Sequence, residues 1–113
     1  MSGMFSDCRF GLVKYRGREY TSDIVVHVDG TVTPRKKEIS RRKHGTSHLM
    51  AEEELEELKT ENPDCIIIGS GVYGALETEF KSAVVLPTCE AIERYNEEKR
   101  RGRRVAAIIH VTC

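Results

Sequence analysis

The sequence has no net charge and no long apolar run. Its 113 residues carry 18 Lys and Arg against 18 Asp and Glu, whereas a dedicated nucleic-acid-binding domain usually has a strong basic excess. No stretch provides the roughly 20 consecutive apolar residues of a transmembrane helix. At 39% hydrophobic residues, the chain is too apolar to be disordered. We therefore expect one globular domain over residues 1–113, with no membrane contact and with nucleic acid disfavoured as a partner.

The sequence also lacks paired cysteines and an export signal. Its four cysteines, Cys8, Cys65, Cys89 and Cys113, are far apart and form no Cys-x-x-Cys motif. The first residues show neither the basic nor the apolar region of a secretory signal. We accordingly expect a cytoplasmic protein with reduced thiols, no metal and no cofactor. The absence of Gln and the scarcity of Asn favour a thermophilic source.

Apolar runs separated by turn residues predict both strands and helices. We expect strands at 10–15, 19–20, 24–28, 31–33, 64–69, 83–86 and 105–111, and helices at 49–60 and 88–101. The runs at 64–69 and 105–111 do not alternate, which is typical of strands buried on both faces. Thr46 or Ser47 is expected to cap the first helix, and Thr88 the second.

The order of these elements predicts an α/β fold. The segment 83–111 reads as a strand–helix–strand unit with a right-handed crossover. The hairpin around Gly17 is antiparallel, so the sheet structure cannot be parallel throughout. We expect a single three-layer domain with a mixed central sheet, flanking helices and an N-terminal β-hairpin layer.

The charges are segregated along the chain. Residues 35–44 and 99–104 are basic, whereas 52–57 contain five Glu. We expect 35–44 to be a mobile or partner-facing loop. The basic segments could bind phosphates or nucleic acid, although few aromatic residues accompany them to stack on bases. Alternatively, basic and acidic segments face each other on a solvated surface, within one chain or between copies.

The Gly69-Ser70-Gly71 turn follows a predicted buried strand. Turns at this position bind ligands in open α/β sheets, because their backbone N–H groups can hold an anion. However, Gly74 comes one residue too early for a dinucleotide fingerprint, and no P-loop lysine follows. The alternative is a tight turn that needs glycine for a positive φ.

Cys89 and His110 are two further candidates for chemistry. A thiol at a helix N-terminus can have a lowered pKa, but Cys89 shares a helix face with Ile92 and Tyr95 and could equally be a small core residue. His110 ends an apolar strand and could act as a base or a ligand, or could be a hydrogen-bonded structural histidine.

Several short segments together resemble the Mth-type domain family. They are Gly45-Thr46-Ser47-His48, Ile67-Ile68-Gly69-Ser70-Gly71, Ala91-Ile92-Glu93-Arg94-Tyr95-Asn96, Gly102-Arg103-Arg104-Val105 and His110-Val111-Thr112-Cys113. The resemblance implies a compact α/β domain with a mixed sheet and a β layer. It implies no established activity or cofactor, and some members resemble assembly factors of mitochondrial complex I. Only Arg42 matches the family pattern in the approach to the first of these segments.

These observations favour a non-enzymatic protein-interaction or assembly module, acting on a protein partner or on a second copy. The alternative is a binder of a small ligand or anion, or an enzyme. Its site would combine Arg42, His48, Gly69, Ser70, Gly71, Tyr95 and Asn96, brought together at a strand end.

Overall fold

The computed structural model describes residues 4–46, 49–78 and 83–112. The strands are β1 (Phe5–Arg9), β2 (Leu12–Tyr15), β3 (Arg18–Tyr20), β4 (Ile24–Val26), β5 (Val32–Pro34), β6 (Leu49–Met50), β7 (Cys65–Ser70), β8 (Glu77–Thr78), β9 (Val84–Leu86) and β10 (Val105–His110). The helices are α1 (Lys37–His44), the 3-10 helix η1 (Glu52–Leu55), α2 (Glu56–Lys59) and α3 (Thr88–Arg100).

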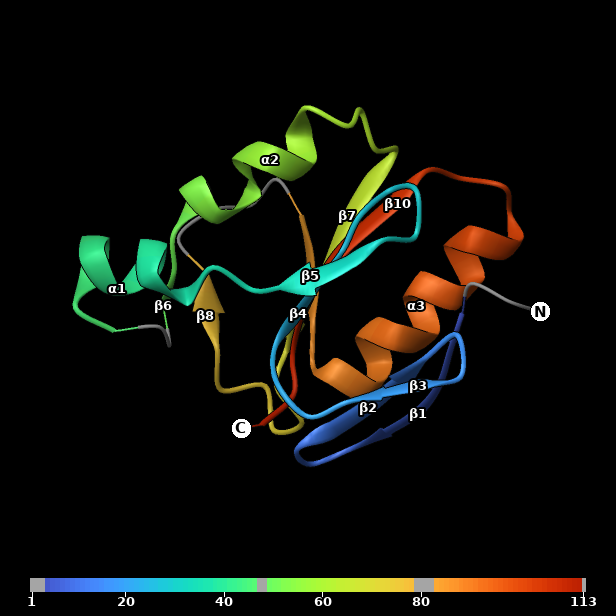
Figure 1. Ribbon diagram of the computed structural model, residues 1–113, viewed down its shortest axis with the longest axis horizontal. Helices are drawn as coiled ribbons and strands as arrows, with labels where there is room; N and C mark the ends of the chain where they lie inside the picture. The colour runs from blue at the N-terminus through green and yellow to red at the C-terminus, as the bar shows by residue number, and fades with distance from the viewer. Residues whose placement is uncertain (1–3, 47–48, 79–82, 113) are drawn as a thin grey trace.

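A mixed five-stranded sheet forms the centre of the fold, in the order β5-β4-β10-β7-β9 (Figure 1). Strand β7 is parallel to both β9 and β10, whereas β4 is antiparallel to β10 and β5. The β9–α3–β10 connection therefore steps over β7. The predicted α/β class and mixed central sheet are confirmed.

The two central strands β7 and β10 are buried on both faces. Ile67 and Ile109 face a core shared with α3, whereas Ile66 and Ile108 face a second core formed with η1, α2 and β6. Successive side chains of a strand point to opposite faces. A strand that has an apolar core on each face therefore requires an uninterrupted apolar run, as the sequence predicts for these two segments.

The N-terminal sheet β1-β2-β3 packs on the far side of α3 (Figure 1). The Tyr15 and Tyr95 hydroxyls are 2.7 Å apart. The Asn96 side chain bonds both backbone groups of Phe5, at 2.9 Å and 2.8 Å. The β-hairpin layer is thus confirmed. The first strand of this layer is β1 at Phe5–Arg9, whereas the sequence predicted the first strand at 10–15.

The basic segment 35–44 is not a loop, which corrects the prediction. Residues Lys37–His44 form α1, which ends at Gly45 with a φ of 75°. Its last turn holds four basic side chains, and cations are favourable at the negative end of a helix dipole. Charge density alone therefore did not distinguish a loop from a helix.

The predicted helix 49–60 is also divided into smaller parts. Residues 49–50 form β6, which pairs with the distant β8, and the helical part begins at Glu52. Its N-cap is Ala51, so Thr46 does not cap it, and Ser47 lies outside the described residues. Thr88 is the first residue of α3 rather than its N-cap.

Two of the cysteines form a disulfide, which corrects the expectation of reduced thiols. Cys8 in β1 is bonded to Cys89 in α3, 81 residues away in sequence. Cys89 is therefore neither a free reactive thiol nor a free cysteine of the core, the two alternatives that the sequence offered. The spacing of the four cysteines does not indicate this disulfide. The pairing depends on how the hairpin layer packs on α3, which the sequence alone does not give.

In the described part of the chain, none of the helices is long and apolar enough to cross a membrane.

Candidate functional site

The Gly69–Gly71 turn is bonded within the protein. The Gly71 N–H donates to Thr88 Oγ1 at 2.8 Å, and the Val72 N–H donates to the Thr112 carbonyl at 2.7 Å. Gly71 has a φ of 104°, and a Cβ on Gly69 would lie 3.0 Å from Thr88 Oγ1. The two glycines thus permit a turn and a close approach to α3. Anion binding at this turn stays a prediction.

The other predicted site residues are on different sides of the molecule. The buried Tyr95 and the half-buried Asn96 hold the hairpin layer on α3, whereas Arg42 is exposed on α1, across the central sheet. His48 lies outside the described residues. The structure therefore does not bring Arg42 together with Tyr95 and Asn96.

A buried ionic network, which the sequence analysis missed, lies near the carboxyl end of β10. Arg35 donates from Nε and Nη2 to both carboxylate oxygens of Glu54, at 2.8 Å and 3.0 Å, and from Nη1 to Asp23 at 3.0 Å. Asp23 also faces His110 Nδ1 at 2.7 Å. Ser40 donates to Glu54 and accepts the Ala51 N–H. All the side chains that carry this network are buried.

The network controls the protonation of Asp23. Burial by itself raises the pKa of a carboxyl group, but hydrogen bonds from His110, Val111 and Arg35 lower the pKa of Asp23 to about 2. Burial likewise opposes the charge of Arg35, whose pKa is nevertheless raised by the Glu54 and Asp23 carboxylates. His110 is hydrogen-bonded to Asp23, as its structural alternative predicts, and a role of His110 as a base or a ligand stays a prediction.

One sequence signal for this network exists at Glu54. It is spaced three residues from Ala51 and four from Leu58, both of which are buried. A carboxylate on the apolar stripe of a helix requires a buried partner. The partner, Arg35, could not be identified without the fold, because it lies within a segment that holds six Lys and Arg residues.

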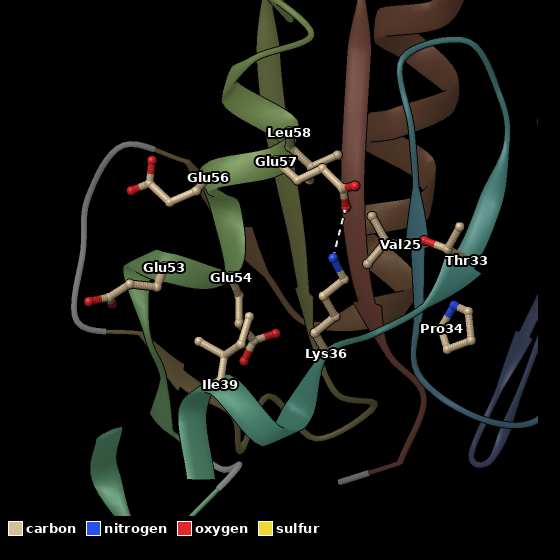
Figure 2. A pocket seen from close by; sticks show the side chains of 10 residues that line it. All are labelled: Val25, Thr33, Pro34, Lys36, Ile39, Glu53, Glu54, Glu56, Glu57 and Leu58. Carbon is tan, nitrogen blue, oxygen red and sulfur yellow. Dashed lines mark hydrogen bonds and ion pairs between the residues drawn. The ribbon is translucent and has the colours of Figure 1, made fainter. Parts of the chain in front are cut away.

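A groove of about 230 Å³ lies over this network, between α1 and the η1–α2 segment (Figure 2). Its apolar surface comes from Val25, Pro34, Ile39 and Leu58. Its charged surface comes from Lys36 and from Glu53, Glu54, Glu56 and Glu57. The groove therefore combines an apolar floor with an excess of carboxylates.

The network fixes the two walls of the groove relative to each other. Ser40 belongs to α1 and Glu54 to η1, and the two are hydrogen-bonded. Arg35, at the entrance to α1, binds Glu54 and links it to Asp23 beside the central sheet. A groove with preorganised walls loses little conformational entropy when a partner binds.

The fold and the groove define a small mixed α/β domain with a preformed surface groove. Residues 5–110 match the family described as "Protein of unknown function (DUF498/DUF598)", and the chain belongs to this family.

Solved structures agree with this assignment. The structure named MT938 is 80% identical, with a TM-score of 0.98 over 99% of this chain and 100% of that chain. Conserved hypothetical protein PH1505 from Pyrococcus horikoshii OT3 is 43% identical, with a TM-score of 0.83 over 96% and 98% of the two chains. A thermophile homologue is thus present, in line with the amide-poor composition.

A more distant structure shows the fold alone. XCC1710 from Xanthomonas campestris is 14% identical, with a TM-score of 0.66 over 95% of this chain and 83% of that chain. The search of curated proteins found no match.

Proposed function

We propose that this domain is a non-enzymatic protein-interaction module whose contact site is the groove between α1 and the η1–α2 segment. The observation that carries the proposal is the groove itself, an apolar floor between walls that a buried ionic network holds in place. Preformed apolar surfaces with a polar rim are typical of protein contact sites.

The resemblance to the Mth-type domains supports the same function. Some members of that family resemble assembly factors of mitochondrial complex I, which act through protein contacts. The segments that carry the resemblance include Gly45-Thr46, directly after the α1 wall of the groove. A cytoplasmic location is part of the proposal and is tested by fractionating cells that express the tagged chain.

Capture of a partner with paired variants tests the proposal. Ile39→Asp places a charge on the α1 wall of the groove, whereas Tyr73→Ser alters an aromatic side chain that is 76% exposed and not part of the groove. We expect one defined protein to copurify in a fixed ratio with the wild type and with Tyr73→Ser. Ile39→Asp should lose it while keeping its circular dichroism spectrum.

The opposite pattern would contradict the proposal. A partner that binds Ile39→Asp as well as the wild type does not use the groove. The ligand-binding alternative at the Gly69–Gly71 turn predicts instead that a metabolite or anion raises the melting temperature, since a ligand at 100 times its Kd adds about 2.7 kcal/mol.

A further inference from the structure

We infer that the groove takes a basic amphipathic segment of a partner protein, with an apolar side chain on the floor and Lys or Arg side chains against the glutamates. This inference rests on the proposed function and names the chemistry of its partner. Four carboxylates and one ammonium group line the groove. Glu53 is paired with Lys43, Glu54 with Arg35 and Glu57 with Lys36, so the negative charge that remains for a cationic segment to complement is that of Glu56.

The available carboxylates are on the rim. Glu54 is buried and bound to Arg35. Glu56 and Glu57 are exposed, and Glu56 forms no ion pair within the described residues. Below them, Leu58 and Val25 are buried in the floor, and Ile39 is half-buried on the opposite wall. A segment that alternates apolar and basic side chains could contact both layers at once.

An ion pair within the protein shows how a cation is placed in the groove. Lys36 Nζ is 3.5 Å from Glu57 Oε1, and the pair crosses the groove (Figure 2). Both side chains are 55% exposed, and such pairs contribute little to stability. An incoming Lys or Arg can therefore replace Lys36 beside Glu57, and Lys36 competes with the partner for this position.

A second copy of the chain is a weaker candidate for the occupant. Its basic segment 99–104 contains no apolar side chain to place on the floor. Arg101 and Arg103 are paired with glutamates of α3, and Arg104 donates to backbone carbonyls. The groove is better matched by a segment that carries both apolar and basic side chains.

Binding of synthetic peptides tests this inference. The probe is a fluorescein-labelled amphipathic peptide of Leu and Lys, measured by fluorescence anisotropy with the full chain. Matched peptides carry Glu in place of every Lys, or Ser in place of every Leu. We expect the Leu–Lys peptide to bind and both matched peptides to bind far more weakly. Added salt should weaken the complex.

Charge variants locate the binding site. Glu56→Gln with Glu57→Gln should weaken binding about tenfold, because it removes two exposed charge pairs. Lys36→Ala should strengthen binding severalfold, because it removes the competing cation. The matched control, Glu90→Gln with Glu93→Gln, removes two exposed charges from α3 and should leave the affinity unchanged.

The inference and the proposed function fail in different ways. Equal loss of affinity in the groove variant and in the α3 control indicates charge attraction at no particular site and overturns the inference. Binding of the Glu peptide at the groove also overturns it, but leaves the interaction function standing. Concentration-dependent dimers that Glu56→Gln with Glu57→Gln abolishes identify a second copy as the occupant and exclude the inferred partner.

Discussion

At the scale of single residues, Asp23 shows how a buried carboxylate can remain charged. It accepts hydrogen bonds from Arg35, from the Val111 backbone and from His110. These contacts lower its pKa from 3.8 to about 2 despite its burial. Because the folded-state pKa is below the unfolded value, the stabilisation is complete above pH 3.8 and is lost as the pH falls toward 2.

Asp23→Asn should make the stability of the domain less dependent on acid pH. The shift of Asp23 corresponds to about 2 kcal/mol of unfolding free energy, which the wild type should lose between pH 4 and pH 2. Between pH 4 and pH 2, the unfolding free energy of Asp23→Asn should fall by about 2 kcal/mol less than that of the wild type. At neutral pH, the variant should be destabilised by about 1.5–3 kcal/mol, because Arg35 keeps Glu54 but loses its charged hydrogen-bond partner Asp23.

Urea denaturation at a series of pH values measures both effects. Glu90→Gln, which changes an exposed carboxylate on α3, serves as the control and should follow the wild type. If Asp23→Asn and the wild type lose the same free energy on acidification, Asp23 does not titrate as the network requires.

At the scale of elements, the sequence predicted those parts whose stability comes from apolar burial. The strands β7 and β10 have a core on each face, so their apolar runs indicate them directly. Helix α1 has no such stripe, because its one buried residue is Ser40. It is docked through hydrogen bonds to Glu54 and Ala51, and such polar docking leaves no periodic signal in the sequence.

The Cys8–Cys89 disulfide should stabilise the attachment of β1 to α3. Replacing both cysteines by serine should lower the unfolding free energy by about 2–4 kcal/mol, since the bond closes a long loop in the unfolded chain. Reduction of the wild type with dithiothreitol should lower its stability by a similar amount, whereas the double variant should not respond. Urea denaturation with and without the reductant measures both, and a wild type that is insensitive to complete reduction would contradict the prediction.

At the scale of the whole molecule, the candidate site depends on contacts between distant segments. Asp23 and His110 are 87 residues apart, and Arg35 and Glu54 are 19 apart. The opposite charges of segments 35–44 and 52–57 are visible in the sequence, but nothing in the sequence separates the two buried partners from their exposed neighbours. The fold makes that separation, because Arg35 and Glu54 are buried whereas Lys36 and Glu57 lie on the rim.

The domain should therefore open in two stages, α1 and η1 first and the central strands β7 and β10 later. Arg35→Ala should affect the first stage. In the wild type, amide hydrogens of α1 should exchange at a lower free energy than those of β10, because β10 is buried throughout its length and α1 buries only Ser40. Arg35→Ala leaves Glu54 and Asp23 without their shared cation, so α1 and η1 should lose further protection while β7 and β10 keep more of theirs. Lys36→Ala changes only an exposed pair and should resemble the wild type. Hydrogen exchange followed by mass spectrometry resolves these segments. A uniform loss of protection in Arg35→Ala, with α1 and β10 equally affected, would mean that the network stabilises the whole fold rather than the walls of the groove.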